Sequence, residues 1–178
     1  MQFYIKSIKI TRVLVLAVFV VTSSVFALYG GGNSDSEQSP ADIEVVQSIK
    51  INKKKDLNFG KITSPGSGTG TAMVFQFYDI LITNNLTHFG GTVHRAEFEV
   101  TGQNNAGYEV HLPNDGDVSM DNGNIILNDF TLDPQSASNL ALGSNGKQTI
   151  WVAATAEVDA NVNSGSFSEE FTVQVNSI

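Results

Sequence analysis

Apolar residues recur at every second position through much of this chain, and that alternation restricts the fold more than any other sequence feature. The pattern is clearest in Ala96–Thr101, whose even positions are apolar and whose odd positions are mainly polar. Ile150–Val158 and Phe171–Val175 show the same period. Because successive side chains of a β-strand point to opposite faces, this pattern predicts strands with one buried face. Beyond residue 27 we find no long stretch with a helical period, so we expect an all-β protein.

Turn-forming residues separate the alternating stretches at intervals of about 8–12 residues, a spacing typical of sandwiches and barrels. Gly102–Gly107 and Asn161–Gly165 are two such turns, and Ser64–Gly70 is a loop by composition. Alternation with one polar face favours antiparallel pairing. We therefore predict an antiparallel β-sandwich, immunoglobulin-like in outline, with no disulfide because the chain contains no cysteine.

The other apolar stretches are less regular. We expect one long strand over Ala72–Thr83, because its β-branched and aromatic residues favour strand over helix. Lys53–Lys55 is interpreted as a solvated turn between two short β-stretches, Ile43–Ile51 and Leu57–Ile62. Ser136–Leu142 is compatible with a short helical turn.

The first 27 residues have the order of a secretory signal peptide. Met1–Arg12 carries three basic residues and no acidic one, and Val13–Val21 is entirely apolar. Val25 and Ala27, one β-branched and one small, occupy the two positions that signal peptidase inspects before a cleavage point after Ala27. The alternative, a membrane anchor, needs about 20 apolar residues, more than this run provides. We expect residues 1–27 to be removed and the protein to be secreted, periplasmic or at the cell surface, with no membrane span afterwards.

Charge and length then limit the classes of partner. Removing residues 1–27 takes away three of the ten basic residues and none of the 18 acidic ones, which leaves a net charge of −11. Such a charge disfavours nucleic acid and anionic lipid as partners, and it fits cations, glycans or other proteins. We expect a Gly- and Ser-rich linker at residues 28–41 and one domain at residues 42–178. A domain of about 150 residues can support its own core without disulfides.

Three stretches together carry a family resemblance. They are Leu57-Asn58-Phe59-Gly60, then Ala96–Gly102, then the C-terminal pair Ile150-Trp151-Val152 and Phe171–Val175. In this order and spacing they resemble the secreted bacterial family catalogued as domain of unknown function 4402, over about residues 42–178. The resemblance implies a fimbrial or other cell-surface β-domain, and it implies no reaction.

Catalytic residues are not arranged in any pattern that we can identify. The chain has no cysteine nucleophile and no Gly-x-Ser-x-Gly elbow between a strand and a helix. Its three histidines are His88, His94 and His111, and they form no metal-ligand motif. We expect a protein that is not an enzyme and that needs no cofactor, calcium being the one ion to consider.

The calcium candidates are Asp115, Asp117 and Asp121, within a loop that is also rich in asparagine and glycine. Calcium prefers several oxygen ligands from a flexible loop. The pattern resembles part of an EF-hand loop but lacks its closing glutamate. The alternative is a solvated turn, in which Asp and Asn tolerate left-handed backbone.

Trp151 is the candidate for glycan binding. Its position in the alternation is opposite to that of Ile150 and Val152, so it would face away from their core. An exposed tryptophan on a sheet could stack against a sugar. The alternative is a strand that is covered on both faces.

The last candidate is an assembly strand. Ile43, Val45, Ile49 and Ile51 share one face of an extended segment that follows the linker. Such a segment could fill a groove in a neighbouring subunit, or it could be the first strand of its own domain. We expect a non-enzymatic exported structural or adhesion-type module, with a fimbrial-like subunit as its most specific form. The alternative is an extracellular module that binds carbohydrate or calcium.

Overall fold

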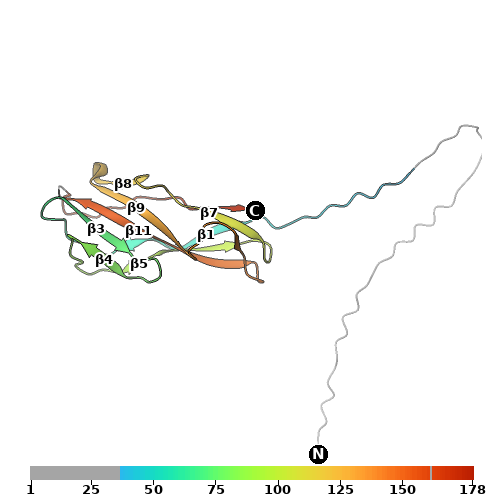
Figure 1. The fold of residues 1–178 in the computed structure, drawn as a ribbon, viewed down its shortest axis with the longest axis horizontal. Coiled ribbons are helices and arrows are strands. Elements are labelled where there is room, and N and C mark those ends of the chain that lie inside the picture. The colour runs from blue at the N-terminus through green and yellow to red at the C-terminus, as the bar shows by residue number, and fades with distance from the viewer. Residues whose placement is uncertain (1–36, 161) are drawn as a thin grey trace, which may run out of the picture. The chain divides into compact units, whose positions relative to one another are not determined.

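The computed structural model describes residues 37–160 and 162–178 (Figure 1). The expected signal peptide, and the linker up to residue 36, lie outside this part of the chain. Residues Ile43–Ile178 form one compact unit. Its regular structure is almost entirely β, with one short 3₁₀ turn, η1 (Asp121–Gly123), and no α-helix in the described ranges. The strands are β1 (Lys50–Lys55), β2 (Asn58–Phe59), β3 (Thr69–Val74), β4 (Leu81–Asn84), β5 (Val93–His94), β6 (Ala96–Thr101), β7 (Gly107–His111), β8 (Val118–Met120), β9 (Ile125–Asp133), β10 (Leu140–Ala141), β11 (Lys147–Asp159) and β12 (Gln174–Ser177).

Strand β11 organises the larger sheet. Its first half pairs antiparallel with β6, where Ile150 lies opposite Phe98. Its second half pairs with β3 along the same edge, and β9 runs along the other edge. Strands β1, β4 and β8 extend the sheet beyond β6, β3 and β9 respectively. The second layer consists of a three-stranded sheet, β10-β7-β12, and a two-stranded ribbon, β2-β5.

The hydrophobic core is thicker at one end of the sandwich than at the other. Between the first half of β11, β6 and the β10-β7-β12 sheet lies the main cluster, whose most buried side chains include Tyr108, Ile150 and Val100. Beneath the second half of β11 the buried cluster shrinks to Val118, Leu127 and Ala156, with partly buried residues around it. The sandwich prediction is confirmed, and its second layer is incomplete at this end.

Ala72–Thr83 does not form the single long strand that its composition predicts. Strand β3 ends at Val74, a turn follows, and β4 begins at Leu81. The turn is closed by the Phe75 N–H, which donates to the Ile80 carbonyl at 2.8 Å. Because β4 is an edge strand, Ile80 and Ile82 are about half exposed, so an apolar sequence alone did not imply burial here.

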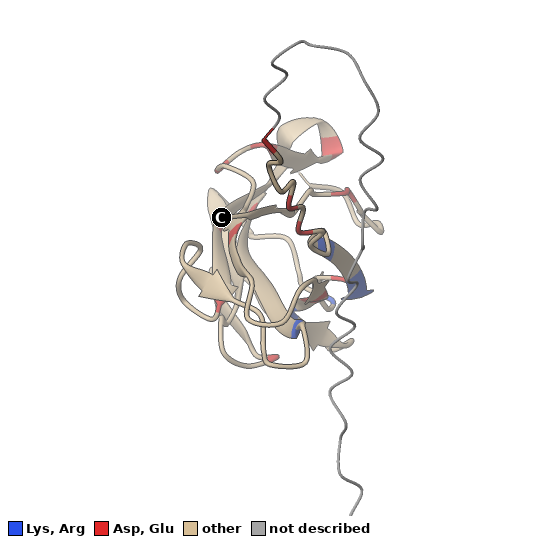
Figure 2. Ribbon diagram, turned by 90° about the vertical axis from the view of Figure 1, so that its right-hand side faces the viewer, with Lys and Arg blue, Asp and Glu red and all other residues tan. Residues whose placement is uncertain are grey.

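The lysines at 53–55 lie in β1 and not in a turn. Strand β1 pairs with β6 as far as Lys55, with a register shift after Lys53. Lys54 forms an ion pair with Glu99 of β6 at 3.0 Å, so a cross-strand partner balances part of its charge. Lys and Arg, blue in Figure 2, gather on this strand. The helical turn expected in Ser136–Leu142 was also wrong, because Leu140 pairs with Tyr108 as part of β10.

Candidate functional site

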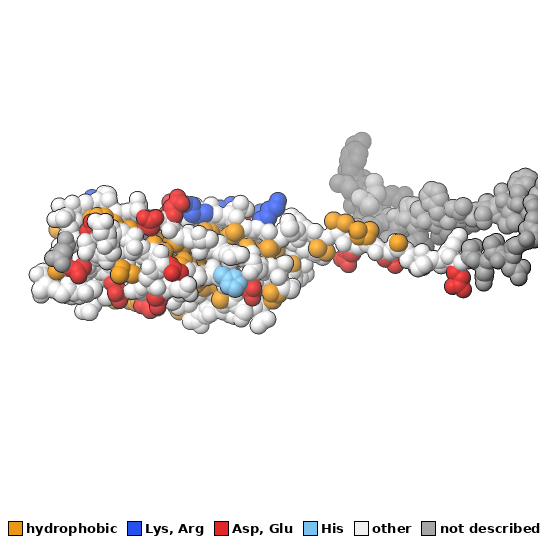
Figure 3. All heavy atoms as spheres, turned by 90° about the horizontal axis from the view of Figure 1, so that it is seen from above, with side chains coloured by type: hydrophobic (Ala, Val, Ile, Leu, Met, Phe, Trp, Pro, Cys, Tyr) orange, Lys and Arg blue, Asp and Glu red, His pale blue; other side chains and the backbone are white. Residues whose placement is uncertain are grey.

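The segment that precedes β1 exposes apolar side chains. Residues 37–49 belong to no strand. Ile43, Val45 and Val46 are 89%, 87% and 60% exposed, the first two among the most exposed large apolar residues in the described chain. Apolar side chains, orange in Figure 3, lie on this thin segment as well as on the body of the domain. Exposed apolar groups gathered in one stretch are typical of a binding surface.

The structure divides the four residues of the expected assembly strand into two pairs. Ile51 lies in β1, opposite Val100 of β6, and packs on the main core together with Ile49. Ile43 and Val45 remain outside the sandwich. All four residues occupy odd positions of the sequence, so the alternation pattern treats them alike. That pattern does not show where the pairing of β1 with β6 begins, which is at Lys50.

A groove lies over the end of the larger sheet at which the buried cluster is small. Two hollows, of about 730 and 640 Å³, share Phe59, Gly60, Met120, Leu127 and Phe167 and so form one continuous depression. In the second hollow the floor comes from β8, β9 and β11, and its apolar residues are Met120, Ile125, Leu127, Ala156 and Val158. The two walls are residues 59–64 and 162–167.

The first wall continues the β2-β5 ribbon. The Lys61 N–H donates to the Gly90 carbonyl at 2.6 Å, and the Thr63 N–H donates to the Thr87 carbonyl at 2.9 Å. In an antiparallel pair the backbone groups of alternate residues face opposite edges. The N–H and C=O of Ile62 therefore point away from the ribbon partner, and Ile62 is part of the groove lining.

The second wall forms no strand. Within the described chain, no backbone hydrogen bond joins residues 164–169 to a neighbouring strand. Phe171 fixes the end of this wall, because its ring packs 5.4 Å from the ring of Phe130 and 6.5 Å from that of Phe98. Phe167 lies on the rim of both hollows and is 38% exposed. Both walls of the groove thus carry backbone groups without a strand partner in the described chain.

Charge differs between the two ends of the groove. At the end lined by Lys53, an ion pair of 2.6 Å joins that residue to Asp56, and Glu169 and Glu170 lie nearby. The hydrogen bond and charge of Asp56 raise the pKa of Lys53, and the same contact lowers the pKa of Asp56. At the other end Lys61 is the one charged residue in the described lining.

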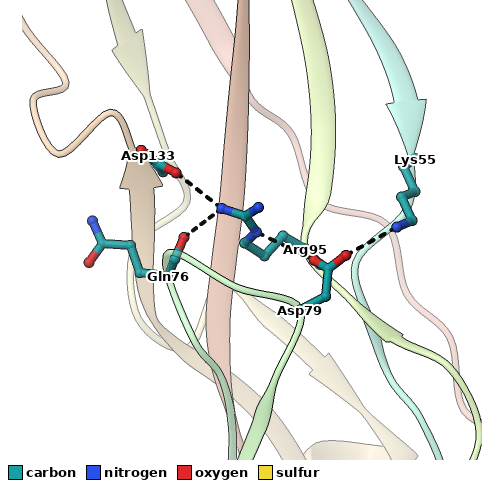
Figure 4. A network of polar contacts seen from close by, with 5 residues as sticks. All are labelled: Lys55, Gln76, Asp79, Arg95 and Asp133. Atoms are coloured by element: carbon teal, nitrogen blue, oxygen red, sulfur yellow. Dashed lines mark hydrogen bonds and ion pairs between the residues drawn. The ribbon is translucent and has the colours of Figure 1, made fainter.

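Trp151 is covered by a cation. The guanidinium of Arg95 lies 5.1 Å from the centre of the indole ring. Arg95 also donates to the carboxylate of Asp133 at 3.1 Å and to the Gln76 carbonyl at 2.9 Å (Figure 4). The ring that the alternation placed on an outer face is therefore stacked against a buried side chain of the same protein. The sequence did not reveal this contact, because its partners lie far apart along the chain.

Asp79 also binds Arg95, through both the side chain and the backbone N–H of the arginine. Its carboxylate accepts the Arg95 backbone N–H at 3.0 Å and pairs with Lys55 at 3.3 Å. Burial by itself would raise the pKa of Asp79, but these hydrogen bonds outweigh burial and the pKa is lowered. Asp79 therefore fixes the turn between β3 and β4 against β1.

The three aspartates considered for calcium serve separate turns. Asp117 accepts the Asn114 N–H at 2.9 Å, and Asp115 accepts the Asp129 N–H at 2.7 Å. Asp121 opens η1 with left-handed backbone. In the described ranges, no three His, Cys, Asp or Glu side chains are grouped as a metal site. Calcium binding by this loop stays a prediction.

The fold and the groove define a class: a cysteine-free antiparallel β-sandwich whose second layer is open along one side. Residues 49–177 match the family described as Domain of unknown function (DUF4402), and the chain belongs to that family. The resemblance drawn from Leu57–Gly60 and the later strands is thereby confirmed. Neither a curated protein nor a solved structure matches the chain. No helix in the described part has the length and hydropathy needed to cross a membrane.

Proposed function

We propose that the protein is a non-enzymatic, exported structural module that assembles with other protein subunits, as a fimbrial-type subunit does. The observation that carries this proposal is the exposed apolar segment before β1, above all Ile43, Val45 and Val46. The proposal of export rests on the sequence of residues 1–27, which resembles a signal peptide.

Burial of the segment supplies a large part of the energy that association needs. Fully burying one Val or Ile side chain contributes about 1.5–3 kcal/mol, so three of them contribute roughly 5–9 kcal/mol before the costs of association. These costs include the ordering of a segment that has no strand partner in its own chain. A further set of contacts on the partner is therefore needed, which a matching groove would supply.

The polar groups of the domain favour a structural role over catalysis. Arg95 forms ion pairs with Asp79 and Asp133, and its guanidinium stacks on the ring of Trp151. His111 pairs with Glu109 at 3.0 Å on an exposed strand end. Each of these groups has a partner that explains its position. The cover that Arg95 gives to Trp151 also makes a glycan platform there the weaker alternative.

Self-association of the predicted mature chain, residues 28–178, tests the proposal. Size-exclusion chromatography with light scattering should show oligomers whose mass rises with concentration. Ile43→Asp combined with Val45→Asp should give monomers with an unchanged circular dichroism spectrum, because neither residue lies in the sandwich. Glu37→Asp with Gln47→Asn, in the same segment, is the matched control and should still associate. A mature chain that stays monomeric up to its solubility limit would overturn the proposal.

A further inference from the structure

We propose that the groove between residues 59–64 and 162–167 binds residues 41–48 of a second copy of this chain as an added β-strand. This inference rests on the proposed function, and it names the partner and the place where the partner docks. The incomplete second layer is the reason: apolar residues of β8, β9 and β11 line the groove, and apart from Phe59 of β2 they are covered by residues 162–167, which form no strand.

Backbone groups on the walls suit an added strand. The N–H and C=O of Ile62, a residue of the groove lining, face away from the ribbon partner, since its neighbours Lys61 and Thr63 bond to that partner. Residues 164–169 lack a strand partner in the described chain. A strand laid between the two walls would pair with these groups, which is the way peptides add to open sheet edges.

The side chains of the segment match the floor. In an extended strand, Ile43 and Val45 point to one face and Glu44 to the other. The first two would pack against the partly exposed apolar side chains of the lining, Phe59, Met120 and Phe167. Glu44 would then face outward, between the walls and the solvent.

Charge favours the end of the groove at Lys61. The segment 41–48 carries Asp42 and Glu44 and no basic residue. Lys61 is exposed and is the one charged residue in the lining described for this hollow. The opposite end, with Glu169 and Glu170, would repel the same segment. The complementary charges therefore place the segment over the Lys61 end.

The segment of the same chain is too short to reach this place. Ile49 lies beside Gly102, whose N–H donates to the Gly146 carbonyl next to the start of β11. From Lys147 to Ala156 a strand extends about 30 Å at about 3.3 Å per residue. Ile43 can extend at most about 22 Å from Ile49. The occupant must therefore come from a second copy.

Disulfide trapping between two copies tests the docking site, and the absence of native cysteine makes it specific. Predicted mature chains carrying Val45→Cys are mixed with chains carrying Ser166→Cys, under mild oxidation. We expect a covalent dimer of the two different variants. Asn104→Cys, on an exposed turn outside the groove lining, is the control and should give at most a trace of dimer. Equal trapping at Ser166 and Asn104 would overturn the inference.

A charge exchange provides the second measurement. Lys61→Glu should weaken self-association by roughly two- to fivefold, since exposed ion pairs contribute little each. Adding Asp42→Lys and Glu44→Lys in the same chain should restore it.

An apolar substitution provides the third measurement. Phe167→Asp, on the groove rim, should weaken association. Phe89→Asp is the control and should not weaken it, because Phe89 is 79% exposed and lies outside the lining.

The outcomes separate this inference from the proposed function. If the mature chain associates through Ile43 and Val45 but neither Lys61→Glu nor Phe167→Asp changes the association, the docking site is wrong and the structural role stands. If the mature chain never associates, the proposed function fails and the docking site fails with it.

Discussion

Arg95 connects three parts of the fold at the scale of single residues. Its guanidinium covers Trp151 of β11, reaches Asp133 at the end of β9, and bonds to the turn after β3 through Gln76 and Asp79 (Figure 4). The side chain is only 13% exposed, so its hydrogen bonds are partly shielded from water. A planar guanidinium can make these contacts at once, which an ammonium cannot.

Arg95→Ala should therefore lower the free energy of unfolding by about 1.5–3 kcal/mol, the range for hydrogen bonds to charged groups. Arg95→Lys should lower it by about 1–2 kcal/mol, because the charge remains but the planar stacking is lost. Urea unfolding followed by circular dichroism measures both. The control is Lys54→Ala, whose exposed ion pair with Glu99 should contribute less than about 1 kcal/mol. Equal losses at Arg95 and Lys54 would contradict the structural role of the cation.

At the scale of elements, the sequence predicted the strands that have one buried and one polar face. Strand β6 keeps the predicted bounds, and β11 contains the predicted set from Ile150 to Val158. The alternation failed for β3 and β4, because both faces of Ala72–Thr83 are mostly apolar and a single aspartate, Asp79, is the only turn-forming residue within that run. It failed for β1, because the partner that balances Lys54 lies in β6.

The groove could not be predicted from the sequence for a physical reason. Its two walls, residues 59–64 and 162–167, are about a hundred positions apart, and neither wall is apolar enough to stand out. In the sequence, the residues of the groove floor are indistinguishable from other core residues, since each is apolar and lies on a regular strand. Only the three-dimensional structure showed that residues 162–167, which form no strand, lie over them in place of a sheet. By contrast, alternation alone made Ile43 and Val45 candidates for an assembly strand, and the structure shows that both are exposed.

Gly60 controls the shape of the ribbon wall, and its substitution tests that element. Its φ is +71°, and an added Cβ would lie 2.8 Å from His88 Nε2 and 2.9 Å from the Gly90 carbonyl oxygen. Gly60→Ala should cost about 1–3 kcal/mol of unfolding free energy, from left-handed backbone and the close contacts. Gly66→Ala is the control, because a Cβ at that position meets nothing within 4 Å. Thermal unfolding should show a lower melting temperature for the first variant and little change for the second.

At the scale of the whole molecule, acidic residues stabilise the fold through their partners. The pKa of Glu99 is lowered chiefly by the hydrogen bond from Lys54, and that of Glu109 by the hydrogen bond from His111. The pKa of Asp79 is lowered by its bonds to Arg95 and Lys55, which outweigh its burial. A carboxylate whose pKa is lower in the folded state stabilises the fold above its unfolded pKa of about 4. That stabilisation is lost as the pH falls through the folded pKa.

The melting temperature should therefore be nearly constant from neutral pH to about pH 5 and fall progressively below about pH 4, where these carboxylates become protonated. Asp79→Asn should lower the melting temperature at neutral pH and reduce the fall at acid pH, since the variant has already lost the charged contacts. Differential scanning calorimetry across this range, with the monomeric Ile43→Asp, Val45→Asp chain as background, measures both effects without interference from association. A profile of Asp79→Asn that runs parallel to the parent profile at all pH values would show that Asp79 does not contribute to the acid sensitivity. If instead the two profiles converge at low pH, one turn between β3 and β4, held by Arg95 and Lys55, contributes measurably to the stability of the whole sandwich.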